Sequence, residues 1–187
     1  GGGMKIICLE ILEIVKDFYD MRKGVKKQLI LINGVPFLIG VCSFFIGTFC
    51  KKNWSVNISD FSSDFLNQLI TVLALFISFS IGYIGMLITS DSESVKIMKQ
   101  KESNYYCIHG EKVKVYQEIH NLMTYTVFVE ILFIIFVFAQ KFFLYIMNEV
   151  VLKIDLCINI SILMHIVILI MIQMRDIYFS FWSAKVK

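Results

Sequence analysis

The chain has 187 residues, of which 57% are hydrophobic and 18% are charged, and its formal net charge is +3. This composition is too apolar for an ordinary soluble domain, and the small charge gives no indication of nucleic-acid binding. No nucleophile-and-base pair and no Gly-rich phosphate loop is visible. Cys107, His109 and His120 lack the paired spacing of a zinc site. We therefore expect neither an enzyme nor a cofactor or metal.

Four stretches are each long and apolar enough to cross a bilayer, since a span needs about 20 mostly apolar residues for a ~30 Å hydrocarbon core. In lipid the backbone polar groups must be satisfied within each segment, so these spans are predicted to be helices. The sequence thus predicts an all-α integral membrane protein with four transmembrane helices. The predicted spans are Leu29–Phe49, Leu66–Thr89, Leu122–Met147 and Leu152–Met174.

The rest of the chain is short, and it is predicted to lie mostly on one side of the membrane. Fourteen of the 18 Lys and Arg residues precede the first span, follow the second or follow the fourth. Positive residues stay in the cytoplasm, so both termini and residues 90–121 are predicted to face inward, in a multi-pass protein of the inner membrane. Six segments result: a tag remnant (1–3), a cytoplasmic amphipathic helix (4–27), spans one and two (28–89), a cytoplasmic helical loop (90–121), the hairpin of spans three and four (122–174), and a cytoplasmic tail (175–187).

The N-terminal helix carries an apolar stripe in heptad spacing beside an acidic one. A helix that lies on an anionic membrane surface usually has Lys and Arg on its polar face. Packing against protein is therefore favoured, either a neighbouring subunit or residues 90–121. Within residues 90–121 we expect a helix, a break around Asn104–Gly110, and another helix from about Glu111. The apolar stripe is Ile7, Ile11, Ile14, Phe18, Met21 and Val25, and the acidic one is Glu10, Glu13, Asp17 and Asp20.

Small and polar residues recur at spacings of three and four in the first two spans, so each set lies on one helical face. Such faces let helices pack closely in lipid, or they line a narrow aqueous path when several copies assemble. We keep both readings open here. Pro36 also predicts a kink, and the bulky segment Phe128–Phe138 of the third span is expected to face lipid all round. The first-span face is Asn33, Pro36, Gly40, Ser43 and Gly47; the second-span face is Asn67, Thr71, Ala74, Ser78, Gly82, Gly85 and Thr89.

Polar residues also occur within the last two spans. In an antiparallel hairpin, residues that face each other have nearly constant index sums, so Glu130 can meet His165. By the same rule either Lys141 or Gln140 can meet Asp155 near the outer surface. A lone charge at mid-membrane costs at least ~2.5–3.5 kcal/mol, so pairing or proton uptake is expected. Two readings remain open, a polar clasp that fixes the hairpin and an ion or proton relay.

Residues 90–121 also contain lysines and tyrosines that are candidates for contact with an anionic ligand such as a nucleotide. Bases stack on aromatic rings, and ammonium groups attract phosphates. The alternative reading is a solvated linking segment, because acidic residues balance the lysines here. The candidate contacts are Lys112, Lys114, Tyr105 and Tyr116.

In its hydropathy pattern, N-terminal helix and middle cytoplasmic loop, the chain resembles the small four-span effector proteins of bacterial antiphage systems. The resemblance implies a membrane channel or disruptor controlled by a nucleotide or oligonucleotide signal that a partner protein makes. It rests on layout and on no sequence motif, so it assigns no functional residue.

The leading hypothesis is a homo-oligomeric, gated ion channel or pore-forming effector, for example a tetramer, whose first or second span lines the pore. One four-span copy is too thin to enclose a path. Its expected partners are other copies, membrane lipids and a small anionic signal. Two alternatives stay open: a proton-linked small transporter that uses Glu130 and His165, and a scaffold that recruits a soluble partner through its N-terminal helix.

Overall fold

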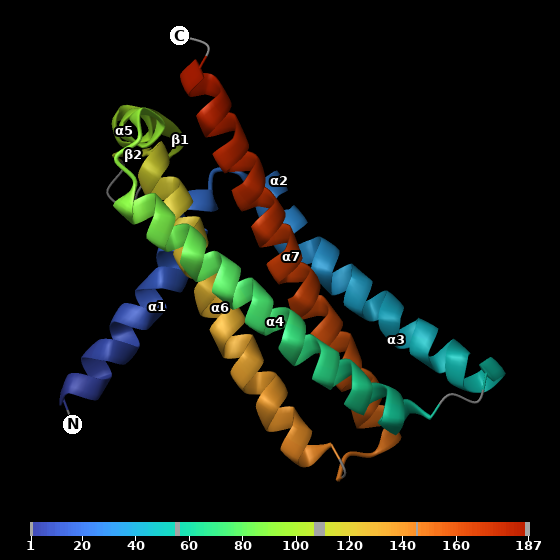
Figure 1. Cartoon of the computed structure of the whole chain (residues 1–187). Coiled ribbons are helices and arrows are strands. Elements are labelled where there is room, and N and C mark those ends of the chain that lie inside the picture. The colour runs from blue at the N-terminus through green and yellow to red at the C-terminus, as the bar shows by residue number, and fades with distance from the viewer. Residues whose placement is uncertain (1, 55–56, 107–110, 145, 186–187) are drawn as a thin grey trace. The chain divides into compact units, whose positions relative to one another are not determined.

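The computed structural model describes residues 2–54, 57–106, 111–144 and 146–185, with side chains for all of these except 2–11, 50–54, 106 and 180–185. Most of the described chain is helical, and Figure 1 colours the elements from blue at the N-terminus to red at the C-terminus. The elements are α1 (Gly2–Arg22), α2 (Lys26–Leu29), the π-helical turn η1 (Ile30–Gly34), α3 (Val35–Trp54), α4 (Ile58–Thr89), α5 (Glu93–Gln100), β1 (Glu102–Tyr106), β2 (Lys112–Lys114), α6 (Val115–Phe143) and α7 (Glu149–Lys185).

Among the residues that the structure describes, four helical segments are long and apolar enough to cross a membrane, which agrees with the number of predicted spans and fits a multi-pass membrane protein. They are Lys26–Phe49, Ile58–Thr89, Val115–Phe143 and Glu149–Phe179. Each begins earlier than predicted, because polar residues continue the helix beyond the apolar stretch. Asn57 precedes α4 and accepts a hydrogen bond from the Ser59 backbone N–H at 3.1 Å. Asn148 precedes α7 and accepts one from Val151 at 3.0 Å, so amide side chains serve as the N-terminal caps.

The segment between the second and third apolar helices contains a small sheet, which corrects the all-α prediction. Ser92 caps α5 by accepting a hydrogen bond from the Val95 backbone N–H. Strands β1 and β2 then pair antiparallel, with Glu102 opposite Lys114, and α6 begins only at Val115. Tyr and Val residues favour extended backbone, and opposite charges face each other across the strands. We predicted a break around Asn104–Gly110: its first residues belong to β1, and residues 107–110 lie outside the described residues. The strand pair itself was missed.

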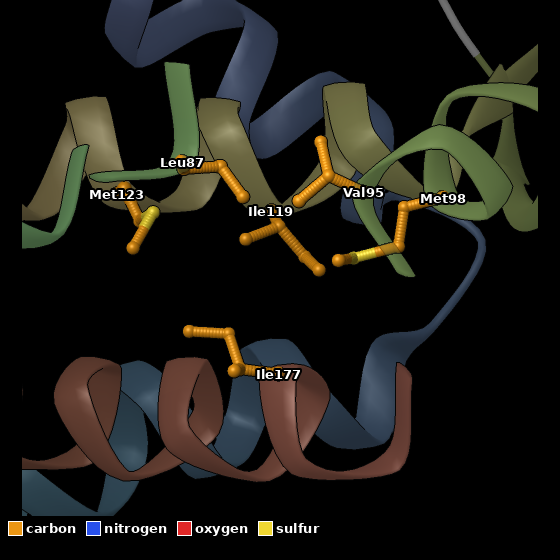
Figure 2. Packing of buried hydrophobic residues seen from close by; sticks show 6 residues of the cluster. All are labelled: Leu87, Val95, Met98, Ile119, Met123 and Ile177. Atoms are coloured by element: carbon orange, nitrogen blue, oxygen red, sulfur yellow. The ribbon is translucent and has the colours of Figure 1, made fainter. Parts of the chain in front are cut away.

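The described chain divides into two compact units, which are considered separately. The first unit comprises Gly1–Leu29, Ser80–Phe128 and Leu169–Lys187. Its apolar core draws side chains from the end of α4, from α5, from the start of α6 and from α7, and Figure 2 shows them converging. The core residues are Leu87, Val95, Met98, Ile119, Met123 and Ile177. This cluster fixes the short segment after α4 onto two long helices, so it positions β1.

The second unit comprises Ile30–Phe79 and Val129–Ile168, and in it α3 packs closely on α7. Gly40 is buried, and a Cβ atom built there would lie 2.7 Å from the Cys157 carbonyl oxygen. It would also overlap the Ser161 hydroxyl oxygen, at 1.8 Å. Only glycine allows this approach of the two helices. The first-span face therefore packs within the protomer around Gly40.

A proline lies beside the same contact. Pro36 has no N–H, so the Ile32 carbonyl oxygen lacks its usual α-helical donor four residues on. The backbone here forms the π-helical turn η1, and His165 Nδ1 lies 2.8 Å from that carbonyl oxygen. A neutral imidazole that donates through Nδ1 satisfies the oxygen. The structure thus has a π-helical turn directly before Pro36, where we predicted a kink, and α7 contacts this turn through His165.

Helix α6 is less exposed than we predicted. We expected its bulky segment to face lipid all round, yet α6 is the most buried of the four apolar helices. Phe133 and Val137 are buried, whereas Ile131 and Ile135 are exposed. Bulk does not decide which side of a helix is covered, because large side chains pack as well as small ones do.

The Gly40 contact yields a matched pair of variants. We expect Gly40→Ala to lower the free energy of unfolding by about 1–3 kcal/mol, the usual cost of overpacking a close contact. Gly47→Ala on the same helix is the control, because nothing lies within 4 Å of a Cβ at that position. Thermal unfolding in detergent measures both. Equal midpoints for the two variants would show that α3 does not approach α7 in this way.

Candidate functional site

The first unit contains a cavity of about 430 Å³ bounded by β1, α6 and α7. It opens beside the small sheet, and its walls combine charged, aromatic and apolar side chains. A cavity of this size accommodates a small organic ligand. It is lined by Lys101, Glu102, Ser103, Asn104, Tyr105, Val115, Glu118, Ile119, Arg175, Asp176 and Phe179.

Several charges in the cavity wall already have partners. The Ser103 hydroxyl donates to Glu118 Oε2 at 2.5 Å, and Arg175 Nε donates to Asp176 Oδ1 at 2.8 Å. The hydrogen bond from the Lys112 ammonium lowers the pKa of Glu102. Three carboxylates and two cationic groups line the walls. This balance favours a small ligand with both donors and acceptors over a polyanion.

Arg22 lies next to the cavity and is almost completely buried at the end of α1. Its Nη1 donates to the Phe18 carbonyl oxygen at 3.1 Å, and its guanidinium carbon lies 4.2 Å from the Phe18 ring centroid. The Tyr105 ring centroid is 5.7 Å away on the cavity side. Burial lowers the pKa of the guanidinium, while Tyr105, Glu118 and Asp176 oppose that shift. The cation is therefore held by aromatic faces and by the negative potential of the cavity wall.

Aromatic contacts and one hydrogen bond connect α1 and α2 to this site. The Phe18 ring stacks on Tyr125 of α6 with 3.7 Å between centroids. The Tyr105 hydroxyl donates to Gln28 Oε1 at 2.5 Å, and burial followed by the charge of Glu118 raises the pKa of Tyr105. The end of α1 thus packs against protein, as the acidic polar face of the helix predicted. Arg22 was not among the predicted site residues: its position four residues after Phe18 indicates that contact, but nothing in the sequence indicates its contact with Tyr105.

The four residues predicted to contact an anion are not gathered in one place. Tyr105 lines the cavity. Lys112 and Lys114 instead approach Glu102, with nitrogen–oxygen distances of 3.1 and 4.0 Å. Tyr116 packs against the apolar core, and the Lys99 ammonium lies 5.0 Å from its ring centroid. Tyr105 is therefore the member of this set that the structure places in the cavity wall.

The two small-residue faces have different surroundings. On the first-span face Pro36 and Gly40 are buried, Ser43 and Gly47 are half-buried, and Asn33 is exposed. All seven residues of the second-span face on α4 are exposed. Hydroxyl groups on that face bond to their own helix: Ser78 donates to the Ala74 carbonyl oxygen at 2.8 Å. Thr71 donates likewise to Asn67.

The polar residues of the last two spans are placed as follows. Of the two partners predicted for Asp155, it is Gln140 that donates to it. Lys141, one residue on, turns toward α4 and donates to Asn67 Oδ1 at 2.6 Å, because consecutive residues of a helix point about 100° apart. The pairing of Glu130 with His165 stays a prediction. Glu130 is fully buried, and the hydrogen bond described for His165 goes to Ile32.

Within the described parts of the chain, no group of three or more His, Cys, Asp or Glu side chains is arranged to hold a metal ion. Cys107 and His109 lie outside those parts. No protein-family model, no curated protein and no solved structure matches the chain. Its function must therefore be argued from its own residues.

The packing of α1 gives a second matched pair. We expect Phe18→Ala to cost about 3–5 kcal/mol, because it removes a fully buried ring from its stack on Tyr125. Hydrogen exchange at the backbone amides of residues 12–22 should then accelerate strongly. The control is Leu12→Ala, since Leu12 is exposed on the same helix. If exchange is equally fast in both variants, α1 is not held through Phe18.

Proposed function

We propose that this protein is a homo-oligomeric membrane channel, in which copies meet along the second-span face of α4 and together enclose an ion-conducting path. The observation that carries the proposal is the complete exposure of that face in the protomer. Its counterpart on α3 is covered around Gly40 by α7. The first-span face thus packs within the protomer, whereas the second-span face is accessible to another molecule.

The shape of α4 supports a protein partner over lipid at this face. A Cβ atom built at Gly82 or Gly85 would meet nothing within 4 Å, so another backbone has room to approach. Bulky residues such as Leu75 and Ile81 are exposed beside the face and form its borders. Lipid tails offer helices no hydrophobic reason to associate, and small-residue stripes replace it with close van der Waals packing.

Conduction is proposed from the chemistry of the same face. Thr71 and Ser78 place hydroxyl groups on it at helical spacing, and Asn67 adds an amide. Such polar groups can line a narrow aqueous path, and they are also small enough to pack against another helix. Because one protomer is too thin to enclose such a path, conduction requires the oligomer.

Control of the channel is proposed for the cavity of the first unit. The distribution of Lys and Arg favours a cytoplasmic position for this unit. A small ligand bound against Tyr105 and Glu118 would contact β1, α6 and α7 together. This arrangement fits an effector that responds to a small cytoplasmic ligand. Of the signals that the resemblance to antiphage effectors implies, the balanced charge of the cavity wall does not favour an oligonucleotide, which is a polyanion.

A proton-linked transporter that uses Glu130 and His165 is less well supported. His165 already has a structural role, because its Nδ1 lies against the carbonyl oxygen that Pro36 leaves without a donor. Loss of proton uptake in a His165 variant would therefore be hard to separate from a disturbed α3.

The channel proposal is tested by adding bulk at neighbouring positions of α4. We expect Ala74→Phe to block close approach of copies, to shift the detergent complex toward the monomer, and to reduce ion flux from liposomes at least ~10-fold. Light scattering after size-exclusion chromatography measures the mass. Val72→Phe is the control, since Val72 is exposed and lies about 160° round the helix from Ala74.

Two results would overturn the proposal. A monomeric wild-type protein in mild detergent and in nanodiscs leaves no oligomer to conduct ions. Equal flux and mass for Ala74→Phe and Val72→Phe would show that the second-span face is not the contact.

A further inference from the structure

A cluster of three polar side chains is buried in the second unit, where α6 packs against α7. It consists of Asp155 and Asn159, one helical turn apart on α7, and Gln140 on α6. Each of the three is more than nine-tenths buried. Polar groups buried in protein are costly unless they are fully paired, so the cluster requires an explanation.

The hydrogen bonds of the cluster all converge on the carboxylate. Gln140 Nε2 donates to Asp155 Oδ1, and Asn159 Nδ2 donates to Asp155 Oδ2 at 3.1 Å. Both amide oxygens, Gln140 Oε1 and Asn159 Oδ1, are buried and have no hydrogen-bond partner in the described structure. A buried acceptor without a donor costs about 1–3 kcal/mol, and here two such acceptors lie on groups that contact one carboxylate.

No ion pair joins Asp155 to a lysine or arginine in the described residues, although two lysines are close in sequence. Lys153 pairs with Glu149 at 2.9 Å, and Lys141 donates to Asn67. The two amide groups that bond Asp155 are neutral. The cluster thus combines one carboxylate with two amide oxygens that lack donors, and it contains no compensating positive charge.

From this arrangement we infer that Asp155, Gln140 and Asn159 form a binding site for a dehydrated monovalent cation of the sodium type. Hard cations take carboxylate and amide oxygens as ligands. One carboxylate matches one positive charge, whereas a divalent ion would leave a net charge buried. Rotation of each amide about its terminal carbon–carbon bond exchanges the donor for the oxygen, so both amides can turn their oxygens toward an ion.

The site is independent of the proposed channel, since it lies within one protomer and needs no second copy. Its occupation would fix α6 to α7 at their connected end. Helix α6 ends at Phe143 and α7 begins at Glu149, so an ion held by both helices would stabilise their pairing near these ends.

The experiment is a thermal melt of the purified full-length protein in detergent, with sodium chloride replacing choline chloride at constant ionic strength and pH. We expect the melting midpoint to rise by a few degrees and to saturate with sodium, because a cation that binds only the folded state stabilises it. Asp155→Asn keeps the shape and removes the charge, so it should lose the sodium response. Asp64→Asn, at an exposed position of α4, should keep it.

Should Asp155→Asn fail to fold, Asn159→Leu and sodium-23 NMR relaxation on the wild-type protein give the same answer. Relaxation that is unaffected by the protein would overturn the site. So would a midpoint equal in sodium and choline, a sodium response retained by Asp155→Asn, or a midpoint that follows pH alone, which would identify a proton as the occupant. None of these outcomes bears on oligomer formation, which is measured by mass.

Discussion

The fold depends on how closely α3 can approach α7. Lipid gives two apolar helices no reason to associate, so the contact must come from backbone proximity and hydrogen bonds. Gly40 provides the first, since any side chain there would collide with the Cys157 carbonyl oxygen. His165 provides the second by reaching the Ile32 carbonyl oxygen beside Pro36. The absence of a side chain at Gly40 and of an N–H at Pro36 thus allows the two contacts that hold α3 against α7.

The two small-residue faces differ in what covers them. The first-span face is covered where Gly40 meets α7, whereas the second-span face on α4 is exposed throughout. Hydroxyl groups there are satisfied by their own helix, so the exposed face costs little in a lone protomer and remains ready for a partner. Both close packing and the proposed assembly therefore rest on small residues at helical spacing.

Much of this architecture was readable from the sequence. Length and apolarity predicted the four helices, and index sums in the hairpin placed either Lys141 or Gln140 opposite Asp155, of which Gln140 is the partner. The sequence does not indicate which side of an apolar helix is buried, because apolar residues lie all round it. That is why the burial of α6 was missed. Strands β1 and β2 were missed because five- and three-residue strands give little periodicity. Arg22 was overlooked because its aromatic partners, apart from Phe18, are distant in sequence.

The central claim, that copies meet along α4, is tested most directly by cysteine cross-linking in native membranes. In a background without the 5 native cysteines, Ser78→Cys should form disulfide-linked dimers on mild oxidation. Phe79→Cys, exposed at the next position, should remain monomeric. Equal cross-linking at both positions, or none at Ser78→Cys, would contradict the claim.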